Sequence, residues 1–230
     1  MKKFLFICFL FFTISAQANS AAERLALSVP QMTENNMSAL AHYLAKGSIN
    51  KYDQAKAIAI WIASHVAYDN YSLATMEGRN VSNRLKKGEQ TAEDVFKTKI
   101  GTCEGYANLY SKMLGIVGIQ NEKVYGFALD GMKTSAQAKN RVKRERIGHV
   151  WNKINIPGHK DILVDITWMS RGQTAQTQKR LTPHMKKQEL QKIKRERPTY
   201  TYNMKYFDFN YKKLQKNGEY RFLSNYQMLK

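Results

Sequence analysis

The spacing of apolar residues predicts helices in the first part of the chain. Residues 33–46 and 53–66 repeat apolar side chains at every third or fourth position, which is the period of one helix face. In the first segment, Thr33 has the side chain of an N-cap and Gly47 can end the helix. Both segments are therefore expected to bury one face against the rest of the domain.

Two further helices are expected toward the middle of the chain. Residues 91–97 predict a short helix that is capped by Thr91. A longer helix is expected to begin at Cys103 and to end at Gly115 and Gly118. Its apolar stripe consists of Tyr106, Ala107, Tyr110, Met113, Leu114 and Val117.

Strand patterns dominate the following part of the sequence. Residues 124–129 predict a short strand, residues 150–156 alternate apolar and polar side chains, and residues 162–168 form a more continuous apolar run. The Pro-Gly turn in residues 157–160 joins the last two runs, as in an antiparallel hairpin. Helices followed by strands indicate an α+β domain, in which the helix that begins at Cys103 packs on the antiparallel sheet.

The first residues have the pattern of a secretory signal peptide. A pair of lysines precedes the apolar run of residues 4–14, and Ala16 and Ala18 are the small residues that a signal peptidase reads. We expect residues 1–18 to be removed, and the protein to be periplasmic or secreted. A retained membrane anchor is the weaker reading, because a span needs ~20 apolar residues and neither this run nor any later one reaches that length.

Cleavage after Ala18 changes the domain plan and the cysteine count. Residues 19–230 then form a single domain, with a core over about 35–170 and a basic, aromatic extension over 171–230. The chain has 2 cysteines, and one of them leaves with the signal peptide. The thiol that stays, Cys103, is either a buried small hydrophobe or a reactive group.

The chain is strongly basic, with a formal net charge of +19 at pH 7. The charge is concentrated in two segments, residues 133–146 and 179–197, which are poor in apolar side chains. Such a surface favours anionic partners, which in a cell envelope are lipids or acidic polymers. Nucleic acid is a weaker expectation after export. The alternative is a pair of solvated loops that only improve solubility.

Cys103, His149 and Asp165 have the residue types and the placement of a thiol-based catalytic triad. A helix N-terminus stabilises a thiolate, and an adjacent imidazole oriented by a carboxylate completes the nucleophile. His149 begins the first hairpin strand and Asp165 lies near the end of the second, so the hairpin brings them together. Each residue alone could be a packing or surface residue, but the three in this order favour catalysis.

Motifs around these residues resemble the transglutaminase-like superfamily. The motifs are Gly101-Thr102-Cys103-Glu104-Gly105-Tyr106-Ala107, His149-Val150-Trp151-Asn152 and Asp165-Ile166-Thr167-Trp168. Residues 58–69, which end in Tyr68-Asp69, resemble the branch that contains kyphoscoliosis peptidases and cytokinesis proteins. The resemblance covers about residues 35–170 and implies a papain-like fold. The basic insert before His149 and the segment after Trp168 depart from the family pattern.

The resemblance implies a role for each residue of the triad. Cys103 would be the nucleophile, His149 the general base and acid, and Asp165 the carboxylate that orients the imidazole. The backbone N–H of Cys103 would help to bind the oxyanion. Tyr68 is either a second oxyanion donor or a structural aromatic residue, and Trp151 is expected in the core.

These features predict an exported cysteine-dependent enzyme that acts on amide bonds of a protein or peptide substrate through a thioester acyl-enzyme. Hydrolysis, by a peptidase or amidase, is favoured over transglutaminase-type transfer to an amine, because no amine-binding site is recognisable. A non-catalytic envelope-binding module that retains the fold is the alternative from another class. No cofactor or metal is expected, because one cysteine and scattered histidines lack the spacing of zinc ligands. Those histidines are His42, His65, His159 and His184.

Overall fold

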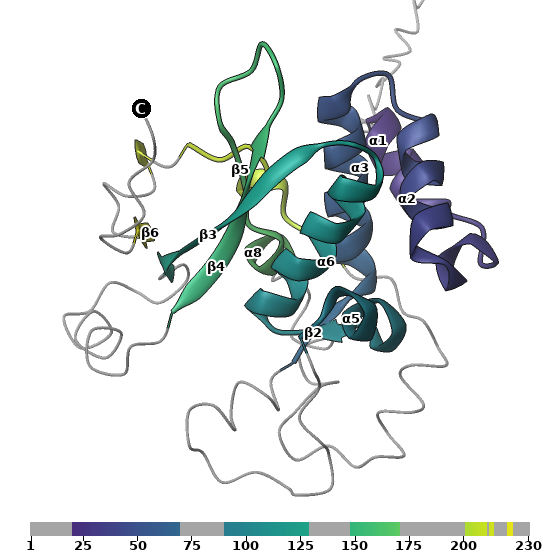
Figure 1. The fold of residues 1–230 in the computed structure, drawn as a ribbon, viewed down its shortest axis with the longest axis horizontal. Helices are drawn as coiled ribbons and strands as arrows, with labels where there is room; N and C mark the ends of the chain where they lie inside the picture. The colour runs from purple at the N-terminus through teal and green to yellow at the C-terminus, as the bar shows by residue number, and fades with distance from the viewer. Residues whose placement is uncertain are drawn as a thin grey trace, which may run out of the picture.

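A computed structural model of the chain describes residues 20–69, 90–128, 148–170, 201–210, 212–213 and 220–222 (Figure 1). Several predictions from the sequence lie outside these ranges. They concern the signal peptide, the basic segments 133–146 and 179–197, the end of the first strand at Leu129, and His184.

Helices precede the main sheet along the chain, which confirms the α+β class. The helices are α1 (Ala21–Leu27), η1 (Thr33–Asn35), α2 (Met37–Lys46), α3 (Lys51–His65), α5 (Ala92–Thr98), α6 (Cys103–Ile116), α8 (Ile166–Ser170) and η2 (Met204–Tyr206). The strands are β1 (Ala67–Tyr68), β2 (Ile100–Gly101), β3 (Gln120–Ala128), β4 (His149–Asn155), β5 (Ile162–Val164) and β6 (Tyr220–Phe222).

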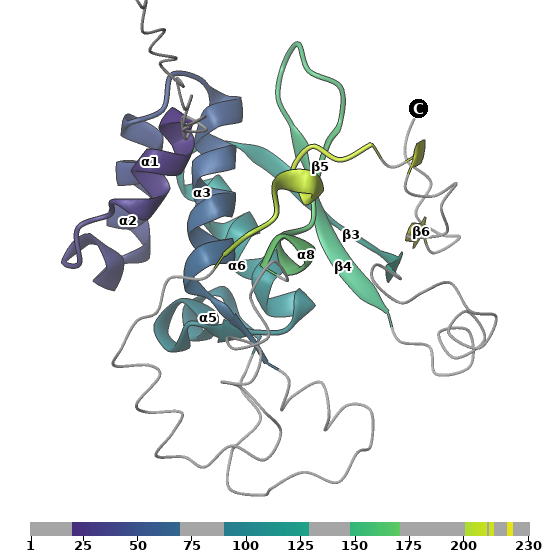
Figure 2. The same ribbon diagram turned by 180° about the vertical axis from the view of Figure 1, so that it is seen from behind.

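Helix α6 lies at the centre, between the N-terminal helices and the antiparallel sheet (Figure 1). It contacts α2 and α3 on one side and β3 and β4 on the other. Its predicted apolar stripe is buried, and Tyr106, Tyr110 and Met113 belong to the hydrophobic core. The view from behind shows α8 beside α3, under the hairpin of β4 and β5 (Figure 2). Burial of α6 on both sides fixes its N-terminus, where Cys103 lies, relative to the sheet.

Side-chain caps set the start of the helices. The Oδ1 atom of Asn36 accepts the N–H of Ala39 at 2.9 Å and begins α2. The predicted start at Thr33 is therefore wrong, because Thr33 opens only a short 3-10 turn. Asn50 caps α3 in the same way and starts it earlier than predicted, whereas Thr91 caps α5 as expected.

The main sheet has four strands in the order β5-β4-β3-β6, and all its pairings are antiparallel. Gly118 ends α6 with a φ of 68°, and the chain then enters β3 at Gln120, before the predicted residue 124. Gly115, which was expected to end the helix, lies inside it. The β4–β5 hairpin turns through Gly158 with a φ of 83°, which confirms the predicted turn.

The second hairpin strand is shorter than the sequence predicts. Strand β5 ends at Val164, and Ile166–Ser170 forms helix α8 instead of continuing the strand. The reason is Asp165, whose Oδ1 accepts the N–H of Trp168 at 3.0 Å and so caps a helix. The residues of α8 are buried against α3 and α6. A short apolar run has the same pattern in a buried helix as in a buried strand, and here the cap decides between them.

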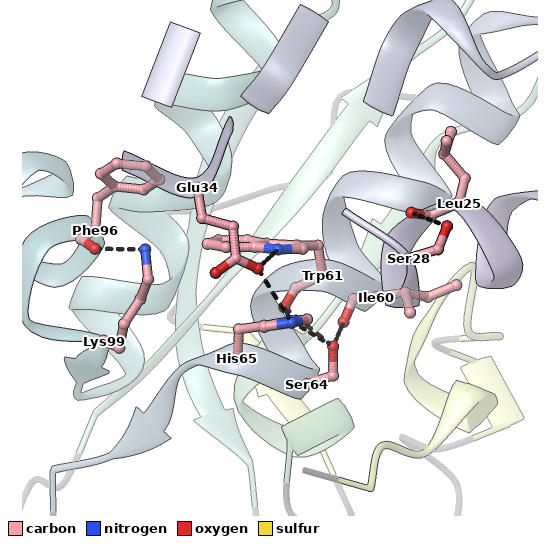
Figure 3. Close-up of polar contacts among 9 residues, drawn as sticks. All are labelled: Leu25, Ser28, Glu34, Ile60, Trp61, Ser64, His65, Phe96 and Lys99. Carbon is pink, nitrogen blue, oxygen red and sulfur yellow. Dashed lines mark hydrogen bonds and ion pairs between the residues drawn. The ribbon is translucent and has the colours of Figure 1, made fainter. Parts of the chain in front are cut away.

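A polar cluster fastens η1 to α3 (Figure 3). The Oε1 atom of Glu34 accepts the indole N–H of Trp61 at 3.3 Å and lies 3.5 Å from Nε2 of His65. The His65 ring stacks on Trp61 with 4.9 Å between centroids, and Lys99 places its ammonium 4.7 Å from the centroid of the Trp61 ring. These contacts join segments that flank α3 and stiffen the helix that packs on α6.

The described parts of the C-terminal extension pack on the sheet. Phe207 forms an isolated bridge with Val164 of β5, and β6 pairs with the end of β3. Within the described ranges, which leave out residues 1–19, no helix is long and apolar enough to cross a membrane.

Candidate active site

Cys103 is the first residue of α6, as predicted, and its side chain is partly exposed. The helix has 14 residues. Its first-turn N–H groups have no partners within the helix, so they present a positive electrostatic potential to the sulfur. The two residues before Cys103, at the entry to the helix, are Gly101 and Thr102, so no bulky side chain directly precedes the cysteine.

Gln90 organises the entry to α6. Its Oε1 atom accepts both the N–H and the hydroxyl of Thr102, at 2.7 and 2.8 Å, and its carbonyl oxygen accepts Nδ2 of Asn108 at 2.6 Å. The Thr102 hydroxyl therefore donates to Gln90 and makes no capping bond to the helix. Gly105 allows this approach, because a Cβ there would lie 2.7 Å from Cγ2 of Val95 and closer still to Gln90.

The Tyr68-Asp69 pair lies beside the same entry. Tyr68 pairs with Gly101 in the parallel β1–β2 bridge, and the N–H of Asp69 donates to the Gly101 carbonyl at 2.9 Å. The Tyr68 ring stacks on that of Tyr106 with 6.4 Å between centroids, and the Tyr106 hydroxyl donates to the Val66 carbonyl at 2.6 Å. The motif is thus part of the support under α6, and a role for Tyr68 in oxyanion binding stays a prediction.

His149 and Asp165 meet at one end of the hairpin, as predicted. Nε2 of His149 donates to Oδ2 of Asp165 at 2.7 Å. The Asp165 side chain is 0% exposed and the His149 side chain 11%. The other carboxylate oxygen of Asp165 accepts the N–H of Trp168. Both oxygens are therefore engaged, and the carboxylate has little freedom to turn away from the imidazole.

Asp165 and Cys103 both favour the protonated form of His149. Burial by itself would lower the pKa of His149, but the charge and hydrogen bond of Asp165 raise it, as do a hydrogen bond and charge from Cys103. The result is a pKa of about 10. Because Asp165 takes Nε2, the ring nitrogen left for the thiol is Nδ1. The arrangement can hold an imidazolium beside the sulfur at neutral pH.

Two tryptophans flank the His149 ring. The Trp151 ring lies 5.8 Å and the Trp168 ring 5.9 Å from it, between centroids. Both indoles are buried, at 1% and 6% exposure. Trp151 is therefore in the core as expected, and the two rings limit the orientations open to the imidazole.

A charged pair lies next to Cys103 in the chain. Nζ of Lys123, on β3, donates to Oε1 of Glu104 at 2.6 Å and to Oδ1 of Asn108 at 2.9 Å. Glu104 directly follows Cys103 in α6, so an unpaired carboxylate there would oppose a negative charge on the sulfur. Lys123 neutralises that carboxylate.

The remaining described histidines lie outside this constellation. His42 is exposed on α2, where it contacts Ser38, and His159 stacks on Tyr52 at the hairpin turn. Burial is the largest influence on His65 and lowers its pKa despite the nearby Glu34 carboxylate. Within the described residues, no group of His, Cys, Asp and Glu side chains is placed to hold a metal ion.

Sequence reasoning did not identify Gln90, Lys123 or Tyr206, whose backbone carbonyl accepts the N–H of Asp165 at 2.9 Å. Gln90 stands at the end of a polar stretch and Lys123 is one of many lysines, so neither has a local signal. Hydrogen bonds between distant segments bring them beside Cys103, from Gln90 to Thr102 and from Lys123 on β3 to Glu104.

Comparison with known proteins places this constellation in a family. Residues 38–170 match the Transglutaminase-like superfamily, and they include Cys103, His149 and Asp165. Kyphoscoliosis peptidase from Mus musculus is 28% identical over 152 residues, and the one from Homo sapiens is 26% identical over 152 residues. Each match covers 64% of this chain and 20% of the relative, so the chain spans about a fifth of the length of these relatives.

Two solved structures are similar to part of the chain at low sequence identity. A TGase crystal structure has a TM-score of 0.41 and 14% identity, and the match covers 69% of this chain and 34% of that one. A candidate cysteine protease from Cytophaga hutchinsonii has a TM-score of 0.39 and 17% identity, with 67% and 45% covered.

Proposed function

Because the chain belongs to the transglutaminase-like superfamily, we propose that it is an exported cysteine-dependent enzyme that hydrolyses amide bonds through a thioester acyl-enzyme. The observation that supports this most is His149, which is bonded to Asp165 at 2.7 Å and has its pKa raised by both Asp165 and Cys103. The relatives named as peptidases fit the hydrolysis of an amide bond.

In the proposed reaction, Sγ of Cys103 attacks the carbonyl carbon of the substrate amide. The N–H of Cys103 stabilises the oxyanion that forms. The His149 imidazolium gives its proton to the amide nitrogen, the C–N bond breaks, and the amine leaves a thioester on Cys103. A water molecule then attacks the thioester carbonyl while neutral His149 takes a proton from it. The C–S bond breaks and releases the carboxylic acid, which leaves the Cys103 sulfur as a thiolate beside protonated His149.

Asp165 supports each step without contacting the substrate in this scheme. It holds the His149 ring through Nε2, so that Nδ1 serves the sulfur and the leaving amine. It also compensates the positive charge that His149 carries before protonating the leaving group.

Transfer to an amine uses the same residues and differs only in the second half-reaction. If a primary amine rather than water attacks the thioester, the product is a new amide and the enzyme is a transglutaminase. We favour water, because no feature of the described residues selects an amine. The alternative from another functional class is a non-catalytic protein that retains the fold and only binds an envelope component.

A substrate-independent experiment tests for an activated nucleophile. The mature protein, with His149→Ala and Cys103→Ala as controls, is treated with iodoacetamide at pH 6, where an unperturbed thiol of pKa about 8.5 is mostly protonated. We expect Cys103 in the folded protein to react at least about 10-fold faster than in the urea-unfolded chain, and His149→Ala to remove the advantage. Equal rates for the folded and unfolded chains would refute the proposed function.

A second assay separates the two reactions. Reduced casein is incubated with the enzyme in the presence of a fluorescent primary amine, and products are identified by mass spectrometry. New peptide termini that require Cys103 indicate hydrolysis, whereas amine attached to glutamine side chains indicates acyl transfer. If Cys103 is activated but neither product forms with casein or with any other peptide pool, the non-catalytic binding module is favoured.

We also propose that the basic segments 133–146 and 179–197 attract an anionic envelope lipid or polymer. The support is the sequence alone, since both segments lie outside the described residues. Such attraction acts over about a Debye length, ~8 Å at physiological salt, and so weakens as salt rises. Replacing Arg141, Lys143, Arg144 and Arg146 by Gln should weaken binding to anionic vesicles and flatten its salt dependence. Unchanged binding would leave the charge as a solvated surface.

A further inference from the structure

The C-terminal extension returns to the candidate active site. Residues 201–210, which lie beyond the region that matches the family, run along the free edge of β5 and beside α8 (Figure 2). Three backbone hydrogen bonds fix them there. The Asn203 N–H donates to the Met169 carbonyl at 2.8 Å, the Asp165 N–H to the Tyr206 carbonyl at 2.9 Å, and the Phe209 N–H to the Leu163 carbonyl at 3.2 Å. We call residues 201–210 the edge segment.

The edge segment completes the set of contacts that immobilise Asp165. The carboxylate binds His149 and the N–H of Trp168, and the main-chain N–H of Asp165 binds Tyr206. This third contact lies at the junction between β5 and α8, where the backbone changes direction. A buried carboxylate at such a junction needs its main chain held if its side chain is to keep one orientation.

Tyr206 also supports the imidazole of His149 indirectly, through the ring of Trp168. Its side chain is buried at 3% exposure, and its ring lies 6.3 Å from that of Trp168. Trp168 in turn lies 5.9 Å from His149. Tyr206 therefore supports both members of the His149–Asp165 pair, one through its carbonyl and the other through the indole.

Two side-chain contacts anchor the edge segment to the N-terminal helices. Near its start, the Tyr202 hydroxyl donates to Oε1 of Glu23 on α1 at 3.0 Å. Near its end, the Tyr52 hydroxyl of α3 donates to Oδ2 of Asp208 at 3.1 Å. Asp208 has a φ of 54°, in the left-handed region that aspartate tolerates better than most residues. The segment is thus tied to helices that are themselves packed in the core.

We propose that Tyr206 is a positioning residue for the His149–Asp165 pair, and that the edge segment is part of the catalytic apparatus although it lies outside the family match. The inference rests on the proposed function. Tyr206 touches neither the thiol nor the substrate in this scheme. It acts by keeping Asp165 aligned with Nε2 of His149, and so by keeping the imidazolium that activates Cys103.

The test compares Tyr206→Leu with Tyr206→Phe and with a remote core variant, Leu44→Ala, in the full mature chain. Leu44 is fully buried in α2, so Leu44→Ala destabilises the fold without changing the site. The rate of Cys103 alkylation by iodoacetamide is measured from pH 6 to pH 9, at a temperature where circular dichroism shows every variant to be folded.

Tyr206→Leu should react about 10-fold more slowly than the parent at pH 6, because a misaligned imidazolium stabilises the thiolate less, and should approach the parent by pH 9, where the thiolate forms without that help. Both variants keep the backbone carbonyl, but Tyr206→Phe also keeps the ring beside Trp168 and should restore most of the rate. Leu44→Ala should keep the parental pH profile despite its lower melting temperature. A Tyr206→Leu profile that superimposes on that of the parent would overturn the proposal, because a merely structural role moves stability alone.

If Tyr206→Leu does not fold, the double variant Tyr52→Phe/Tyr202→Phe decides. It removes only the two anchoring hydroxyls and should slow alkylation at pH 6 by about 3-fold, in the same direction; a parental profile would overturn the proposal. Failure of the proposed function has a different signature. In that case Cys103 is alkylated no faster in the parent than in His149→Ala. If only the positioning role is wrong, Cys103 is still alkylated faster in the parent than in His149→Ala.

Discussion

His149 and Asp165 are separated by 16 positions in the chain, yet Nε2 of one lies 2.7 Å from Oδ2 of the other. Strand β4 begins with the histidine, and β5 ends immediately before the aspartate. The same carboxylate caps α8 through its other oxygen. One residue therefore orients the imidazole and ends the strand, so a change at this position has two consequences that can be separated.

Asp165→Asn and Asp165→Ala separate these consequences. Asparagine is also a good N-cap, so Asp165→Asn should be about 1 kcal/mol more stable than Asp165→Ala, which lacks the cap. Both variants should lose the stabilisation that the charge of Asp165 gives to protonated His149. Neither variant has the negative charge that favours the imidazolium form of His149. In both, iodoacetamide should therefore alkylate Cys103 at least about 10-fold more slowly at pH 6 than in the parent. Urea unfolding and iodoacetamide kinetics measure the two effects. Parental kinetics in Asp165→Asn would mean that the carboxylate charge does not activate the thiol.

Much of the helical frame could be predicted from the sequence, because its signals are local. The apolar stripe of α6 lies at helical spacing, Thr91 caps α5 as its side chain predicts, and the turn at Gly158 joins the expected hairpin. The resemblance to the transglutaminase-like superfamily is also confirmed, since its motifs span contiguous residues. Errors at Thr33 and Gly115 concern element ends, where several polar or small residues compete as caps.

The parts that could not be predicted depend on contacts between distant segments. Residues 166–168 have a strand-like apolar pattern, and only the bond between Asp165 and the N–H of Trp168, together with burial on α3 and α6, selects the helix. Tyr206 belongs to an aromatic tail with no recognisable periodicity. Its position beside Asp165 follows from pairing with the edge of β5, which has no signature in a single sequence.

The stability of the fold should depend on pH through His149. Its pKa is raised from 6.5 to about 10, against the effect of burial, mainly by Asp165. The folded protein therefore binds a proton more tightly than the unfolded chain. This stabilisation is fully present below pH 6.5 and is lost as pH rises toward 10, by up to about 1.4 kcal/mol per pH unit.

Cys103→Ala is the background for this measurement, because the ionisation of the thiol would otherwise offset part of the change. Asp165 remains in that variant, so the pKa of His149 should stay raised. The free energy of unfolding in urea is measured from pH 6 to pH 10 for Cys103→Ala and for Cys103→Ala/His149→Gln. The single variant should lose more stability across this range. Parallel curves would contradict a raised pKa of His149.

Export should produce a mature chain that begins at Asn19. Helix α1 starts just beyond this point, where Ser20 and Glu23 form a capping box, so cleavage after Ala18 leaves the first helix whole. Mass spectrometry of protein isolated from the native cell envelope gives the N-terminus. The control replaces Ala16 and Ala18 by Leu, which should block the peptidase and leave the precursor. A native protein that still carries residues 1–18 would refute the prediction.

The Glu104–Lys123 pair should favour a negative charge on Cys103. Glu104 follows Cys103 directly, and Lys123 lies 2.6 Å from its carboxylate. Burial alone would lower the pKa of Lys123, but its hydrogen bond to Glu104 raises it, so the ammonium stays charged. Lys123→Met should therefore leave an uncompensated carboxylate near the sulfur and slow alkylation at pH 6. The side chains are 31% and 36% exposed, so solvent screens the effect to about 3-fold at low salt.

Two further variants make this prediction specific. Glu104→Gln/Lys123→Met removes both charges and should return the rate to near the parental value. Lys112→Met removes an exposed positive charge from the same helix, where Lys112 lies 3.7 Å from Glu93, and should leave the rate unchanged. The Lys123→Met effect should also shrink as salt rises from 10 mM to 1 M, since the Debye length falls from about 30 to about 3 Å. If the double variant stays as slow as Lys123→Met, then Lys123 acts through packing against α6 rather than through the charge of Glu104.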